Sequence, residues 1–146
     1  MCLSSLTVSF ADTGDLSGKV FTFPEKGSTA YVRLTPSSTK ILYSATFCLR
    51  LRMFVNWIHS VKKSLKAGGS IAGTSIILGQ HQGSYGERFE SSQAFVGQIK
   101  DVHMWDHVIS TCAIKSYMQG LVHSHGNNLS WTKLGFSIHG QVLLED

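Results

Sequence analysis

The stretch that decides the fold covers residues 75–105 and reads SIILGQHQGSYGERFESSQAFVGQIKDVHMW. Residues 75–78 form an apolar run of strand length that ends at Gly79. Residues 96–105 alternate between two sets of side chains with a period of two, which predicts a second strand. The stretch is therefore predicted to be a strand, a long polar loop and another strand.

The loop between these strands, residues 80–93, is rich in side chains that carry oxygen ligands. They are Gln80, Gln82, Ser84, Tyr85, Glu87, Glu90, Ser91, Ser92 and Gln93. Calcium takes six to eight oxygen ligands from carboxylates, amides and carbonyls, and a loop on a rigid sheet is a common place for them. The loop is thus a candidate calcium site. The alternative is a polar surface loop that binds nothing.

Further strands and one helix are predicted along the chain. The expected strands are 20–23, 29–34, 41–57 and 134–144, and the expected helix is 110–120. Ser110 can cap this helix and Gly120 can end it. Many short strands with turns and one helix predict an all-β sandwich, in which Trp105 and Trp131 belong to the core.

Length and composition fit one globular domain. The chain has 146 residues, of which 42% are hydrophobic and 15% charged, and its net charge is +4. The basic residues are scattered and are not interleaved with aromatic residues, so no nucleic-acid partner is expected. No apolar run of 18 residues is present, so no membrane-spanning helix is expected. We also expect no enzyme, because neither a nucleophile elbow nor a phosphate loop is found.

Three motifs carry a resemblance to a known family. Residues 75–80 (SIILGQ), 89–93 (FESSQ) and 102–106 (VHMWD) resemble the pentraxin family. Residues 18–51 resemble the start of the pentraxin domain, and residue 62 onward resembles its second half. The resemblance implies a jelly-roll sandwich of the legume-lectin kind with one short helix.

The resemblance also implies a large internal deletion. In the family, several strands and a signature His-x-Cys-x-Ser/Thr-Trp-x-Ser follow the segment that matches Phe47-Cys48-Leu49, and about a third of the domain is absent here. The chain then divides into a degenerate leader at 1–11 and a truncated domain at 12–146, made of an N-terminal part (12–52) and a C-terminal part (53–146). The junction is predicted to be one continuous strand with an apolar face. A sandwich that has lost strands is expected to expose inner faces that its sequence still encodes as apolar.

By resemblance, the protein would be secreted, lectin-like and homopentameric, and would bind phosphate-bearing or carbohydrate ligands in innate immunity through calcium. The family's calcium ligands fall here on Gln82, Glu90 and Gln93. Two further ligand positions hold His81 and Gly83 in place of acidic residues, and an Asp-Asn pair lies in the missing segment. Calcium affinity is therefore expected to be weak or lost. Zinc at His81 is not favoured, because zinc needs three or four close nitrogen or sulfur ligands.

The alternative function is that of a non-binding fragment, from a decayed or aberrantly spliced gene, whose only role is to pair a strand with an intact family member.

The three cysteines, Cys2, Cys48 and Cys112, agree with a deletion, because the family partner of Cys48 is in the lost signature. They are predicted to be unpaired, although an odd number in a secreted chain also fits an intermolecular bond. The apolar patch at 3–11 is a weak signal peptide, since no basic residue precedes it. Asn128-Leu129-Ser130 fits a glycosylation sequon, which matters only if the chain is secreted.

Overall fold

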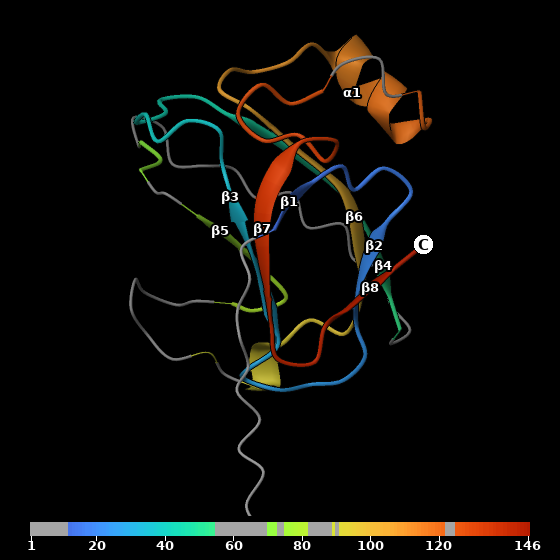
Figure 1. The fold of residues 1–146 in the computed structure, drawn as a ribbon. Helices are drawn as coiled ribbons and strands as arrows, with labels where there is room; N and C mark the ends of the chain where they lie inside the picture. Colours follow the sequence, from blue (N-terminus) through green and yellow to red (C-terminus); the bar gives the residue numbers. More distant parts are fainter. Residues whose placement is uncertain (1–11, 55–69, 73–74, 82–88, 90, 122–124) are drawn as a thin grey trace, which may run out of the picture.

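A computed structural model describes residues 12–54, 70–72, 75–81, 89, 91–121 and 125–146 (Figure 1). Their strands are β1 (Asp12–Gly14), β2 (Val20–Phe23), β3 (Tyr31–Thr35), β4 (Thr46–Met53), β5 (Ile76–Leu78), β6 (Gly97–Trp105), β7 (Leu134–His139) and β8 (Leu143–Glu145). The helices are α1 (Thr111–Met118) and a short 3-10 helix, η1 (Ser91–Gln93). The strands form two antiparallel four-stranded sheets, in the orders β1-β7-β3-β5 and β4-β6-β2-β8. The predicted all-β sandwich with one short α-helix is confirmed.

The core lies between the two sheets, which face each other in Figure 1. Phe21 on β2 contacts the Trp131 and Phe136 rings edge-on, with centroid separations of 5.4 and 5.6 Å. Because Phe136 belongs to β7 in the other sheet, this cluster joins the two layers. Such edge-to-face contacts add about 0.5–1.5 kcal/mol to the apolar burial. Trp105 and Trp131 are both buried, as predicted.

The prediction of one strand over 134–144 is wrong. Gly140 adopts a φ of 67° between β7 and β8, and the two strands belong to different sheets. A Cβ atom at Gly140 would lie 2.6 Å from the Thr29 carbonyl oxygen, so only glycine fits this corner. The alternation continues on both sides of the corner, and the pattern therefore gave no sign of it. Strand β1, which pairs with β7, was not predicted from the sequence.

The apolar face predicted for the junction strand lies on β4, at one edge of its sheet. Residues 55–57 of that prediction lie outside the described residues, and Leu42 makes only an isolated bridge to Ile71. Phe47 is paired with Met104 and Leu51 with Ile99, so both occupy the inner face together with buried partners. Phe47 is nevertheless 41% exposed and Leu51 51% exposed. The expectation that an inner face is left uncovered is confirmed for this strand.

Helix α1 begins and ends as predicted and is attached to the second sheet. The Ser110 hydroxyl accepts a hydrogen bond from the Ala113 amide at 3.2 Å, and Gly120 takes a φ of 79° after the last turn. On the sheet side, the buried Tyr117 donates its hydroxyl to the Asp101 carbonyl oxygen at 2.7 Å. Burial raises the pKa of Tyr117, so this hydroxyl remains a donor. The helix is thereby attached at the point where β6 bulges against β4.

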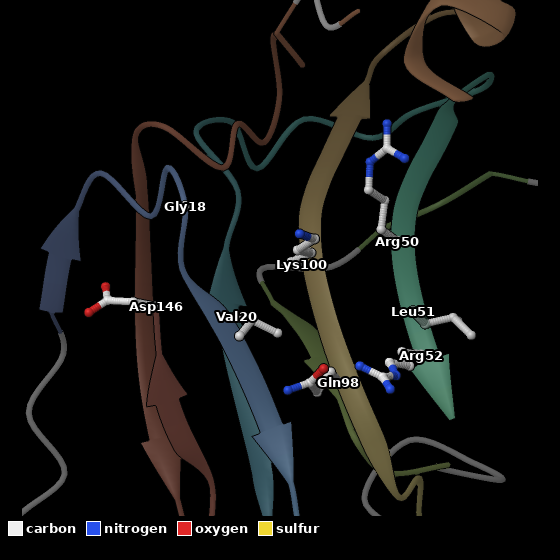
Figure 2. Close-up of a pocket in the computed structure, with 8 residues that line it drawn as sticks. All are labelled: Gly18, Val20, Arg50, Leu51, Arg52, Gln98, Lys100 and Asp146. Atoms are coloured by element: carbon white, nitrogen blue, oxygen red, sulfur yellow. The ribbon is translucent and has the colours of Figure 1, made fainter. Parts of the chain in front are cut away.

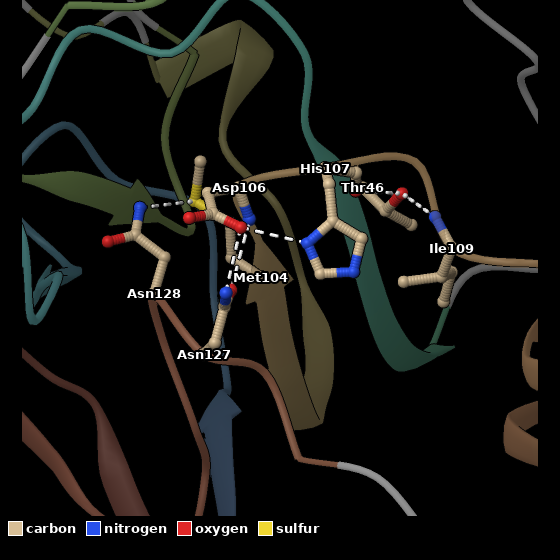
Figure 3. Close-up of polar contacts among 7 residues, drawn as sticks. All are labelled: Thr46, Met104, Asp106, His107, Ile109, Asn127 and Asn128. Carbon is tan, nitrogen blue, oxygen red and sulfur yellow. Dashed lines mark hydrogen bonds and ion pairs between the residues drawn. The ribbon is translucent and has the colours of Figure 1, made fainter.

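The segment that returns from α1 packs closely on the end of β6. Figure 3 shows the Asp106 carboxylate accepting a bond from the Asn127 amide nitrogen at 2.7 Å, and the Asn127 side-chain oxygen accepting from the Asp106 amide at 3.1 Å. Asn128 is 4% exposed, and its side-chain nitrogen lies 3.7 Å from the Met104 sulfur. Asn128 was the predicted glycosylation site. Burial of Asn128 disfavours a glycan there in the folded chain, and the sequon stays a prediction.

The segment approaches β6 so closely that a side chain at Gly126 would overlap backbone atoms. A Cβ there would lie 2.1 Å from the Leu129 carbonyl oxygen and 2.5 Å from the Met104 carbonyl oxygen. We predict that Gly126→Ala lowers the free energy of unfolding by about 1–3 kcal/mol, as overpacking does. Urea unfolding measures this. Gly27→Ala is the control, because a Cβ there meets nothing within 4 Å. Equal losses in the two variants would contradict the prediction.

His103 on β6 makes the unfolding free energy pH-dependent. It is 2% exposed, and its Nδ1 accepts a hydrogen bond from the Gly126 amide at 3.2 Å. Burial lowers the pKa of His103 below 6.5, and the neighbouring His125 adds to this. The unfolded chain consequently binds more protons between that lowered pKa and about pH 6.5, so stability is complete above this window and falls as the pH falls through it.

We predict that the wild-type chain loses up to about 1.4 kcal/mol per pH unit from this histidine within the window. His103→Asn keeps an acceptor for the Gly126 amide and should flatten the curve. Burial and Arg33 also lower the pKa of His139, so part of the slope should remain. Urea unfolding between about pH 5 and 8 measures it, with the exposed His81→Asn as control. An unchanged slope in His103→Asn would refute the assignment.

Candidate functional site

The predicted donor loop leaves β5 and returns to β6 through a fixed base. The Phe95 amide donates to the Gly79 carbonyl oxygen at 2.9 Å, which joins the two ends of the loop. Gly79 has a φ of 94°, and a Cβ there would lie 2.2 Å from the Phe23 ring, so this position requires glycine. The two ends of the loop are thus held together at the edge of the core, as expected for a loop that a rigid sheet holds in place.

Gln80, one of the predicted oxygen donors, is used to hold the loop against the first sheet. Its side-chain nitrogen donates to the carbonyl oxygens of Gly27 at 2.6 Å and Ala30 at 2.9 Å. Its side-chain oxygen is buried and has no hydrogen-bond partner among the described residues. Further along the loop, Phe89 packs on the Tyr31 ring at 5.1 Å. Gln80 therefore positions the loop, a role that its residue type alone did not reveal.

Only part of the predicted ligand set lies within the described residues. His81 and Gln93 are exposed, Gln93 within η1. Gln82, Gly83 and Glu90 lie outside the described residues. Within the part of the chain that the structure describes, no three or more His, Cys, Asp or Glu side chains are grouped to hold a metal ion. The calcium site therefore stays a prediction.

The donor set fits one weakly held calcium ion. The predicted ligands supply one carboxylate, from Glu90, and two amide oxygens, from Gln82 and Gln93. Water and backbone carbonyls would have to complete the six to eight oxygens that calcium requires. The imidazole of His81 is a poor calcium ligand, since calcium prefers oxygen. This arrangement has too little negative charge for a tight site.

The two cysteines among the described residues are both free thiols. Cys48 is partly buried on β4, and burial raises its pKa, whereas Cys112 is exposed at the start of α1. A buried thiol with a raised pKa is protonated at neutral pH and therefore unreactive. This agrees with the expected unpaired Cys48; Cys2 lies outside the described residues.

A second polar site, which the sequence analysis missed, lies on the second sheet. A cavity of about 320 Å³ opens there, and Figure 2 shows its lining. The lining residues are Gly18, Val20, Arg50, Leu51, Arg52, Gln98, Lys100 and Asp146. Arg50 and Arg52 alternate on the predicted junction strand and Lys100 alternates on β6. The three cations lie on neighbouring strands only because β4 pairs with β6. Sequence periodicity does not predict which strands pair.

Comparison with known proteins agrees with the predicted relationship. The sequence model of the Pentaxin family matches residues 51–146. Serum amyloid P-component of Homo sapiens is 30% identical over 210 aligned positions, which cover 98% of this chain and 93% of that protein. Mucosal pentraxin of Mus musculus is 28% identical over 211 positions, with the same coverage. The crystal structure of a native heptameric SAP-like pentraxin from Limulus polyphemus aligns with 96% of this chain and 90% of that chain, at 13% identity and a TM-score of 0.45.

The alignments also show the predicted internal deletion. The alignment with the human protein has 210 positions and this chain has 146 residues, so at least 64 positions have no residue here. Both proteins are covered almost from end to end, and the unmatched positions therefore lie within the chain. The family match begins at residue 51, next to the predicted junction. The chain belongs to the pentraxin family and lacks an internal part of its domain.

Proposed function

We propose that this chain is a pentraxin-type binding protein, not an enzyme, that holds one calcium ion weakly in the loop of residues 80–93. The ion would bridge to a phosphate or carbohydrate oxygen of the ligand. The observation that carries this proposal is the retained loop, whose two ends are joined by the Phe95–Gly79 hydrogen bond. Membership of the pentraxin family also supports a binding function.

In this proposal Gln82, Glu90 and Gln93 are the protein ligands of the ion. Glu90 supplies their only negative charge, so its removal should abolish binding. Calcium sites with few charged ligands have dissociation constants near about 1 mM. A protein that works in extracellular fluid can use such a site, since calcium is plentiful there. We therefore include secretion and homopentameric assembly in the proposal, supported by the serum and mucosal relatives. No helix within the described ranges is both long and apolar enough to cross a bilayer.

We predict that about 10 mM calcium stabilises the chain by about 1.4 kcal/mol, the linkage value for a dissociation constant near 1 mM. For a chain of this size that is a rise in Tm of about 3–6 °C. Glu90→Gln should remove the rise. Glu25→Gln is the matched control, because it loses the same charge at an exposed turn. Differential scanning calorimetry in calcium and in EDTA measures the effect, and the absence of any wild-type rise would refute the calcium site.

A second candidate function rests on the uncovered face of β4. Leu51 and Met53 lie on the inner side of this edge strand and are 51% and 41% exposed. An intact pentraxin possesses the segment of at least 64 positions that this chain lacks. Docking onto an intact family member would cover the face, and the free edge of β4 offers hydrogen bonds to an added strand. In this case the chain acts as an interaction partner and binds no ligand of its own.

We predict that a tagged chain co-expressed with full-length mucosal pentraxin is purified together with it. Leu51→Ser with Met53→Ser should abolish the association, because the variant removes apolar area from the docking face. Val108→Ser with Met118→Ser is the matched control, since these apolar residues are still more exposed but do not belong to the inner face of β4. Recovery of equal amounts with both double variants would exclude docking through β4.

A further inference from the structure

We infer that the cavity on the second sheet is a binding site for a phosphate- or sulfate-bearing small molecule, independent of calcium. The cavity of about 320 Å³ lies over β4, β6 and β2 (Figure 2). Its volume falls within the range of small-molecule sites. Phe21 and Ile99 face the core, so alternation places Val20, Gln98 and Lys100 on the outer face of the same strands. The lining residues that the structure describes include none from the donor loop, so the two sites are distinct.

The strand register gathers positive charge on this face. Arg50 is directly paired with Lys100, and Arg52 with Gln98. Like charges directly opposite each other on neighbouring strands are destabilising. Figure 2 shows the Arg52 guanidinium directed toward β6, which brings a third cation to the same pair of strands. An arrangement that costs stability in the unliganded chain is stabilised when an anion binds between the cations.

Two of the three acidic residues near the cavity are in ion pairs. Asp101 forms one with Arg50 at 3.0 Å, and Asp146, which lines the cavity, forms one with Lys19. Glu145, on the neighbouring β8, accepts a hydrogen bond from Thr22. Arg52 and Lys100 have no ion-pair partner within the part of the chain that the structure describes. These two cations are therefore the groups that line the cavity and can pair with an anion.

Arg50 is held in place at the end of the cavity that lies near α1. Besides the ion pair, its guanidinium donates to the Tyr117 carbonyl oxygen and lies 4.8 Å from the centre of the Tyr117 ring. Asp101, its ion-pair partner, has a φ of 52°, an uncommon conformation for a residue other than glycine. Backbone strain of this kind is often found at functional sites. Because these contacts hold Arg50 in place, Arg52 and Lys100 are the cations expected to contact the ligand.

The chemistry of these groups favours a tetrahedral oxyanion. A guanidinium donates two parallel hydrogen bonds to phosphate or sulfate oxygens, and an ammonium adds a point charge. The Gln98 amide nitrogen donates to Thr22 at 3.3 Å, which leaves the Gln98 carbonyl oxygen as an acceptor for a hydroxyl group. Val20 supplies an apolar contact. The expected ligand is therefore a phosphate or sulfate ester with a small hydroxyl-bearing body.

Isotope-labelled chain titrated with inorganic phosphate in EDTA, at constant ionic strength set with chloride, tests the inference by NMR. We expect saturable shifts of the Arg52, Gln98 and Lys100 amides. Arg52→Gln with Lys100→Gln should weaken phosphate binding at least about tenfold, which corresponds to the loss of two charge-assisted contacts. Arg52→Lys with Lys100→Arg keeps both charges and should bind within about threefold of wild type. Glucose 6-phosphate and glucose 6-sulfate then distinguish the two sources of the oxyanion.

Lys26→Gln with Lys40→Gln is the matched control, because it removes the same charge from two exposed lysines that do not line the cavity. It should bind phosphate within about twofold of wild type, since electrostatics at that range are screened. An equal loss in the control, or shifts no larger than those in chloride alone, would overturn the inference. Glu90→Gln should leave phosphate binding unchanged, so failure of the calcium site and failure of this site are distinguishable.

Discussion

The structure depends on the burial of two sheet faces against each other, and that burial is complete only on one side of the sandwich. Around Phe21, Trp131 and Phe136 the two layers interlock, and these side chains are fully or almost fully buried. The inner face of β4 is not fully covered. Phe47 and Leu51 on this face are about half exposed, although their partners on β6 are buried. Complete burial of such a side chain stabilises a fold by about 1.5–3 kcal/mol. The inner face of β4 therefore contributes less to stability than the core around Phe21.

The two ends of the donor loop are attached to the well-packed part of the sandwich. The loop is fixed by Gly79 and Gln80, whose contacts run to Phe23, Phe95 and the β2–β3 connection. Phe23 is buried in the core, and Phe95 packs edge-on against its ring. The ligand set stays a prediction from the resemblance, which places His81 and Gly83 at two of the ligand positions. The contacts that fix the loop ends therefore do not depend on the predicted calcium ligands.

The sequence predicted those features that depend on residues close together in the chain. The cap at Ser110 and the end of α1 at Gly120 are local patterns, and the structure confirms them. The predicted alternation along β6 holds only as far as Asp101, because the strand bulges there and the four residues that follow are all buried. The corner at Gly140 was missed, because the alternation continues past it. The basic cavity was missed for a different reason. Arg50 and Lys100 are far apart in sequence and become neighbours only through the register of β4 with β6.

The two proposed sites attract anions in opposite ways. In the loop, an anion is bound only after a cation has been held, and the loop now contributes little of the negative charge that such a cation needs. On the second sheet, Arg52 and Lys100 attract an anion directly, and added salt weakens that attraction by screening. A chelator should therefore affect the first site alone, whereas ionic strength should affect mainly the second. The net charge of +4 favours the direct attraction of anions.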